Sequence, residues 1–127
     1  MEVKELRIGN YLHDRNDNLC KVIELRADGI YAPAVDLAIT GLPNKPIELT
    51  KEWFEKFNLN HDGILYSAKD EIKKESAKDV GVRYVSYFFN KRLGKWMDCQ
   101  TRIVFDYVHQ VQNHYYVMTG EELTIKS

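Results

Sequence analysis

The last quarter of the chain constrains the fold most, because a strand pattern, a helix pattern and a helix stop follow one another there. Residues 101–106 have the composition of a strand, and residues 107–118 repeat apolar side chains at helical spacing. At about 100° per residue, these fall in one stripe, made of Val108, Val111, Tyr115 and Met118. Asp106 is a suitable N-cap, and Gly120 is suited to end the helix. We therefore predict a C-terminal helix that packs one face on a sheet.

The first third of the chain predicts a β-meander. Residues 6–13 and 19–26 have strand composition and enclose a turn at 14–18 that is rich in Asn and Asp. Residues 27–29 indicate a tight hairpin that leads into a third strand at 30–32. We expect these strands to form a small, barrel-like N-terminal sheet.

The middle of the chain combines a proline-rich segment with one short helix. All three prolines lie in residues 33–46, which predicts a loop or an edge, and a short strand is expected at 46–49. Thr50 is a good N-cap for a helix over 51–57. Residues 69–79 alternate in charge and predict a surface loop or a frayed helix.

A long hairpin is predicted between these segments and the C-terminal helix. Its strands are residues 82–89 and 96–105, and residues 90–95 connect them. In the return strand the side expected to be buried consists of Met97, Cys99, Ile103 and Phe105. The predicted fold is therefore a single α+β domain, residues 1–127, of antiparallel β-meanders with one short and one C-terminal helix packed on the sheet.

Composition narrows the class of protein. At 127 residues the chain has the length of one domain. Its net charge is −1, whereas most nucleic-acid-binding proteins carry an excess of basic residues that neutralise phosphates. No apolar run is long enough for a membrane span, and the charged N-terminus lacks the apolar core of a signal peptide. We expect a cytoplasmic protein in which Cys20 and Cys99 are buried free thiols.

Three blocks of the sequence resemble a known family. They are Leu6-Arg-Ile-Gly-Asn-Tyr11, Pro46-Ile-Glu-Leu-Thr-Lys-Glu-Trp53 with Phe57, and Tyr107-Val-His-Gln-Val-Gln-Asn113 with Thr119-Gly-Glu-Glu-Leu-Thr-Ile125. They are similar to the recurring blocks of a family of small proteins from gut bacteria and their phages and mobile elements. The resemblance implies a bacterial or mobile-element origin, a cytoplasmic location and a complete chain, and it implies no particular activity.

No catalytic, cofactor-binding or metal-binding set stands out in the sequence. His109 and His114 are five residues apart, about 140° around a helix, which is too far for one metal ion. The His-Asp pairs at 13–14 and 61–62 fall on predicted turns, where Asp is explained by turn chemistry. Neither a nucleophile elbow nor a Gly-rich phosphate loop is present. We therefore predict that the protein is not an enzyme.

Two surfaces are candidates for contact with a partner. The predicted hairpin strand is apolar on both faces, so its rings belong either to the core or to an exposed interface, and the contact candidates are Tyr87 and, in the return strand, Trp96. On the C-terminal helix, His109, Asn113 and Tyr116 lie away from the apolar stripe, where they serve either recognition or plain solvation.

The leading hypothesis is a non-enzymatic binding or adaptor protein of a phage or mobile element. It would act through protein–protein contacts, with another protein or as a homodimer. The alternative is a nucleic-acid-binding module that uses residues 87–96, with bases stacked on the rings beside Lys91, Arg92 and Lys95. A small enzyme built from distant residues is the weakest alternative.

Overall fold

The computed structural model describes residues 6–14, 16–26, 29–32, 44–61, 63, 65–67 and 85–125. These residues form antiparallel sheets and two helices, which confirms the predicted α+β class. The predictions for 33–43 and 69–79 lie outside the described residues. Contacts divide the chain into two compact units, Met1–Glu48 with Tyr107–Asn113, and Leu49–Asp106 with His114–Ser127. The single domain predicted from chain length stays a prediction.

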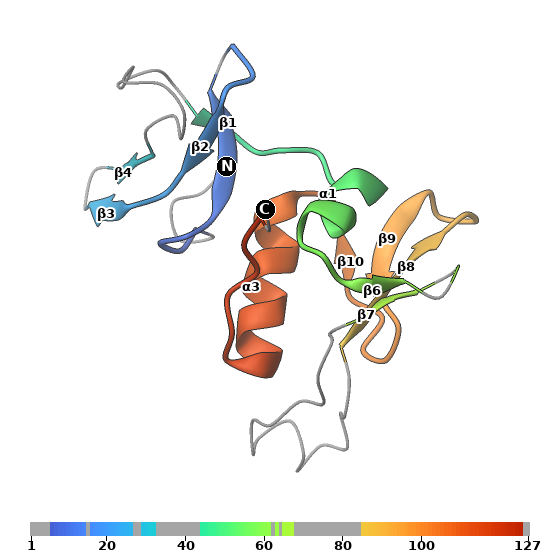
Figure 1. Ribbon diagram of the computed structural model, residues 1–127. Coiled ribbons are helices and arrows are strands. Elements are labelled where there is room, and N and C mark those ends of the chain that lie inside the picture. The colour runs from blue at the N-terminus through green and yellow to red at the C-terminus, as the bar shows by residue number, and fades with distance from the viewer. Residues whose placement is uncertain are drawn as a thin grey trace. The chain divides into compact units, whose positions relative to one another are not determined.

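The first unit is built from short strands. They are β1 (Tyr11–Asp14), β2 (Leu19–Lys21), β3 (Glu24–Arg26), β4 (Gly29–Tyr31) and β5 (Asn44–Lys45). One sheet has the order β2-β1-β5. Strand β3 pairs with β4 in a separate hairpin, as Figure 1 shows. The strand predicted over 19–26 is therefore interrupted and shared between two sheets. The described strands close no barrel, so the barrel-like sheet that we expected is not formed by them.

Side chains alternate between the two faces along β2 and the residues that follow it. Cys20 and Val22 are buried, whereas Ile23 is half exposed. Val22 packs in a small apolar cluster with Leu6 and Leu12. Burial of this face fixes the register of the sheet, because a slip by one residue would exchange the two faces.

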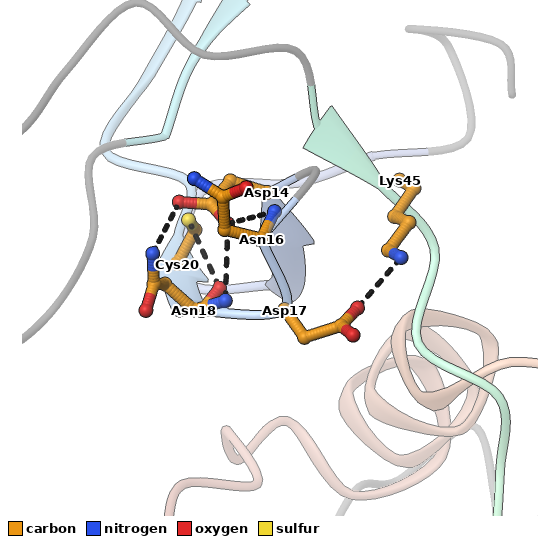
Figure 2. Close-up of polar contacts among 6 residues, drawn as sticks. All are labelled: Asp14, Asn16, Asp17, Asn18, Cys20 and Lys45. Atoms are coloured by element: carbon orange, nitrogen blue, oxygen red, sulfur yellow. Dashed lines mark hydrogen bonds and ion pairs between the residues drawn. The ribbon is translucent and has the colours of Figure 1, made fainter.

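The turn between β1 and β2 is closed by a buried carboxylate (Figure 2). Asp14 Oδ1 accepts the N–H groups of Asn16 at 2.9 Å and Asn18 at 3.0 Å, and Asp14 Oδ2 accepts the Asn18 side-chain amide at 3.0 Å. Asp17 takes the left-handed conformation at φ 62° and pairs with Lys45 on β5 at 2.6 Å. The predicted turn at 14–18 is confirmed, and its chemistry is that of an Asp side chain bonding its own main chain.

The second unit contains a five-stranded antiparallel sheet of order β10-β9-β8-β7-β6. Its strands are β6 (Asn60–His61), β7 (Tyr66–Ser67), β8 (Ser86–Asn90), β9 (Lys95–Asp98) and β10 (Val104–Phe105). The pairing of β8 with β9 confirms the predicted hairpin, and Gly94 in its turn has φ 66°. Figure 1 shows the two strands side by side. Residues 82–84 of the first predicted strand lie outside the described residues.

The short helix α1 (Lys51–Lys56) begins after Thr50, as predicted, although the Thr50 side chain makes no capping hydrogen bond. Trp53 and Phe54 are buried beneath it, and Phe57 at its end is buried too. A helix of this length depends on such packing for its stability. The strand predicted over 46–49 is not formed; instead β5 lies just before it, and Glu48 makes an isolated bridge with Tyr107.

The predicted return strand 96–105 is divided by a turn. Strand β9 ends at Asp98, Arg102 adopts φ 63°, and β10 then pairs back onto β9. Cys99 and Ile103 are consequently exposed, so their predicted burial is wrong. Cys20 is buried as expected, and both cysteines are free thiols.

The C-terminal helix α3 (Val108–Thr119) is confirmed, although it begins at Val108. Tyr107 therefore precedes it in place of the predicted cap Asp106, and its N–H donates to Gln110 Oε1 at 3.0 Å. Asp106 contacts Lys95 instead. The predicted apolar stripe is buried at Val108, Val111 and Tyr115 and half-buried at Met118.

A glycine ends α3. Gly120 has φ 78°, and its N–H donates to the carbonyl oxygen of Tyr116 at 2.8 Å. This conformation is unfavourable for other residues, which confirms the stop that the sequence predicts.

Candidate binding pocket and polar clusters

The five residues predicted to contact a partner differ in accessibility. Tyr87 and His109 are 0 % and 1 % exposed. Tyr87 therefore belongs to the core, which is the first of its two predicted alternatives, and the expectation that His109 lies away from the buried side of the helix is wrong. Asn113 and Trp96 are half-buried, and Tyr116 is 40 % exposed. Tyr87 packs against the rings of Phe54 and Phe105, and His109 stacks on Tyr107.

Part of the polar side of α3 organises the first unit. Gln112, which is fully buried, accepts the Tyr11 N–H with Oε1 at 2.8 Å and donates from Nε2 to the Gly9 carbonyl oxygen at 3.0 Å. Both polar atoms of this amide are thus used against the main chain before and at the start of β1. Gln112 therefore has a structural task that explains its burial.

Asn113 extends the same network. Its Oδ1 accepts from Arg7 Nε at 3.0 Å and from Asn10 Nδ2 at 2.8 Å. Asn10 Oδ1 in turn accepts the Arg7 N–H at 2.7 Å, so the three side chains hold the N-terminal turn to the helix. Asn113 thus stabilises the first unit, and its proposed role in partner contact stays a prediction.

A buried chain of three polar side chains lies in the second unit. The Tyr87 hydroxyl lies 2.9 Å from His114 Nδ1, and His114 Nε2 lies 3.0 Å from Asp98 Oδ2. The carboxylate only accepts, so the tautomer of His114 with its proton on Nε2 suits this contact and leaves Nδ1 to accept the Tyr87 O–H. Sequence reasoning missed this chain because its members are distant in sequence and carry no common motif.

Asp98 is the anchor of this chain. Burial alone would raise its pKa, but the hydrogen bonds from His114, from the Thr101 hydroxyl at 2.6 Å and from the Gln100 N–H at 3.1 Å outweigh burial and hold the pKa below its usual value. Burial, followed by the charge of Asp98, raises the pKa of Tyr87 well above its usual value. Tyr87 is therefore a neutral hydroxyl donor with no exposed surface, which suits a structural role and gives a substrate no access.

The second unit also contains a pocket of about 600 Å³ that is open to solvent. Helix α1 and its N-terminal side, strands β6 and β7 and the β8–β9 hairpin contribute its lining residues, which are Leu49, Thr50, Lys51, His61, Gly63, Tyr66, Phe89, Lys91 and Trp96. This volume lies within the range of small-molecule and side-chain sites. Of the predicted contact residues, Trp96 and Lys91 meet here.

The pocket wall is a cluster of interlocked rings. Trp96 lies with its ring centroid 4.6 Å from Phe54, 5.4 Å from Phe89 and 5.9 Å from Tyr66. His61 stacks on Tyr66 at 4.0 Å with an interplanar angle of 3°. These contacts hold the wall in place. Sequence reasoning named neither His61 nor Tyr66 as a site residue: His61 lies on strand β6, which was not foreseen, and Tyr66 lies on β7, where a strand was predicted without a site.

Charge around the pocket is uneven. Lys51 and Lys91 are exposed lining residues, and none of the lining residues that the structure describes is a carboxylate. Of the other two predicted nucleic-acid contacts, Arg92 is exposed outside the lining and Lys95 is paired with Asp106. The three cations of the hairpin are thus not gathered at one site.

Metal ligation finds no support in the described part of the chain, where no three His, Cys, Asp or Glu side chains are grouped for an ion. None of the helices in that part combines the length and the hydropathy needed to span a bilayer.

Comparison with known proteins identifies no relative. A scan against protein-family models finds no match, and searches of the curated proteins and of the solved structures return no similar protein. Function is therefore inferred from the chemistry of the described residues.

Proposed function

We propose that this protein is a non-enzymatic binding or adaptor protein that works through protein–protein contacts made at the ring-walled pocket of its second unit. The observation that carries the proposal is the exposed aromatic surface of that pocket, where Phe89 is 44 % exposed and Trp96 is half-buried. Aromatic side chains held rigidly in a concave site contribute most of the binding energy at many interfaces. The partner is another protein or a second copy of the chain.

Two further observations support this proposal. The chain Tyr87–His114–Asp98 resembles a catalytic relay in its contacts, but it is buried and serves the packing of the second unit. The resemblance of the sequence blocks to a family from gut bacteria, phages and mobile elements supports a cytoplasmic adaptor of a phage or mobile element as the biological setting.

Photo-crosslinking in the bacterial cytoplasm tests the proposal. The photoreactive residue p-benzoyl-phenylalanine replaces Phe89 in the pocket or, as the matched control, Leu93 in the turn of the same hairpin. We expect a discrete protein adduct from position 89 that is absent from position 93 and is lost when Trp96→Ala is added. An adduct of twice the chain mass identifies a second copy. Equal adducts from both positions, or none from position 89, contradict the proposal.

The alternative function is binding of single-stranded nucleic acid, and the presence of Phe89, Trp96 and Lys91 in one pocket favours it. It predicts that the Phe89 crosslink contains nucleic acid and is removed by nuclease. It also predicts that binding of an oligonucleotide weakens steeply as salt rises. An adduct that resists nuclease and yields peptides of a protein partner excludes this alternative.

A further inference from the structure

We infer that the pocket takes a peptide segment of the partner in which an aromatic or large apolar side chain stands next to a carboxylate. This inference rests on the proposed function and names the chemistry of its partner. It follows from three properties of the pocket and its surroundings. These are the exposed ring surface, the positive charge at the rim and the position of carboxylates outside the lining.

The ring surface selects an apolar group. Trp96 touches Phe54 and Tyr66 on the inner side, and Phe89 meets it with ring planes 65° apart. The inner rings Phe54 and Tyr66 are buried, whereas Trp96 and Phe89 retain exposed surface. An aromatic side chain that enters the pocket can therefore meet these rings edge to face or offset-stacked, the two arrangements that aromatic pairs prefer.

The rim selects a negative charge. Lys51 lies in the first turn of α1 and Lys91 lies in the hairpin turn, and both line the pocket. Neither forms an ion pair with a residue that the structure describes. A carboxylate beside the apolar side chain of the ligand would meet these ammonium groups, which act as compact point charges.

The surroundings disfavour a polyanion. The pKa of Tyr66 is raised by burial and then by the charges of Glu55 and Glu52, so two carboxylates act on the pocket wall from α1. A nucleic-acid strand would bring repeated phosphates toward that negative charge, whereas a peptide can place one carboxylate at the lysines. The net charge of −1 supplies no general attraction for nucleic acid either. The charge pattern therefore favours the acidic peptide.

Fluorescence anisotropy with the full chain and defined probes tests the inference. The main probe is a labelled ten-residue peptide with one Phe flanked by Asp on both sides. Comparison probes carry Ala in place of Phe, Lys in place of Asp, or Asn in place of Asp, and the last probe is a ten-nucleotide oligo-dT. We expect the Phe-Asp peptide to bind with a Kd on the order of 10–100 µM and about tenfold more tightly than each peptide comparison.

Variants connect the binding to the pocket. We expect Trp96→Ala and Phe89→Ala each to weaken binding about tenfold, and Lys91→Gln about threefold. Lys56→Gln, on the same helix as Lys51 but over the Trp53 ring and outside the lining, is the control and should leave binding unchanged. Phe89 has an exposed side chain, so we expect Phe89→Ala to keep the fold even where Trp96→Ala disturbs it. Near-ultraviolet circular dichroism checks the tertiary packing of both variants.

Each outcome separates the inference from the proposed function. If the Lys-flanked or Asn-flanked Phe peptide binds as well as the Asp-flanked one and depends on Trp96, the inference is overturned and the proposed function stands. If no peptide binds while the protein adduct at Phe89 still forms, the inference alone fails. If oligo-dT binds more tightly than the Phe-Asp peptide and its binding depends on Trp96, the inference is overturned. If the adduct at Phe89 is also nuclease-sensitive, the proposed function is overturned as well.

Discussion

Replacement of Asp98 by asparagine should destabilise the second unit, although it changes only one atom of the side chain. Asp98 is 3 % exposed, and both of its oxygens accept: Oδ2 faces Thr101 and His114, and Oδ1 accepts from Gln100. Asparagine offers one oxygen and one NH₂ group, so on one side a donor meets a donor. If His114 changed tautomer, its Nε2 could accept the new N–H, but its Nδ1 would then no longer accept the Tyr87 hydroxyl.

The magnitude follows from the groups left unsatisfied. A buried polar group without a partner costs about 1–3 kcal/mol, so we expect Asp98→Asn to lower the free energy of unfolding by about 2 kcal/mol at pH 7. Urea unfolding followed by tryptophan fluorescence measures this difference. Both tryptophans, Trp53 and Trp96, belong to the second unit, so the signal reports on the unit that carries the change.

The pH dependence provides a second test of the same reasoning. The pKa of Asp98 is lowered in the folded protein, because hydrogen bonds outweigh the effect of burial, which alone would raise it. Its contribution is therefore present above the unfolded pKa and is lost as pH falls through the folded pKa. The difference in stability between wild type and Asp98→Asn should shrink below about pH 4.

The control is Glu121→Gln, which removes an exposed carboxylate from the same unit and should change stability by less than about 0.5 kcal/mol. If Asp98→Asn is as stable as this control at pH 7, the hydrogen bonds to Asp98 are not stabilising. If the difference in stability between wild type and Asp98→Asn grows as pH falls below about 4, the assigned direction of the Asp98 pKa shift is refuted.

Three smaller changes test other parts of the fold. Gln112→Ala leaves the Tyr11 N–H without an acceptor and should cost about 2 kcal/mol in thermal unfolding followed by circular dichroism; an unchanged midpoint contradicts the network. Gly94→Ala should cost about 1 kcal/mol in urea because of φ 66°, although nothing lies within 4 Å of the new methyl group; a gain in stability contradicts the assigned turn conformation. Asp14→Ala should speed hydrogen exchange at the Asn18 N–H, and an unchanged exchange rate refutes the turn. Hydrogen bonds from Asn18 and Asn16 outweigh burial and lower the Asp14 pKa, so protection of this N–H in the wild type should fall only below about pH 4.

Local chemistry predicted a substantial part of this fold. The turn at 14–18 and the stop at Gly120 each depend on side-chain or backbone preferences within a few residues. Such features are legible in a single sequence, because the interactions that form them are close along the chain.

The burial of polar residues on α3 was harder to predict. Gln112 lies four residues after Val108 and therefore on the buried stripe, which is a signal that the sequence contains. What the sequence does not show is the main chain at Gly9 and Tyr11 that satisfies this amide. His109 was likewise assigned to the outer side because polarity, rather than packing, decided its predicted face.

The return strand and the pocket show the same limit. Asp98, followed by Gln100 and Thr101, carries the chemistry of an Asx turn, but the alternation of apolar residues suggested one continuous strand. The pocket joins residues from Leu49 to Trp96 through pairings between distant strands. The strand pairings of the sheet and their register place these residues together, and a single sequence does not show which strands pair.

The most direct test of the proposed site uses the indole N–H signals of the two tryptophans in a ¹H–¹⁵N correlation spectrum. Trp96 lines the pocket, whereas Trp53 is buried on α1 and serves as an internal control. On titration with the Phe-Asp peptide, we predict that the Trp96 indole signal shifts progressively to saturation while the Trp53 signal stays in place. A shift at Trp53 with Trp96 unchanged, or no shift at either indole while the peptide binds, would contradict the assignment of the pocket as the binding site.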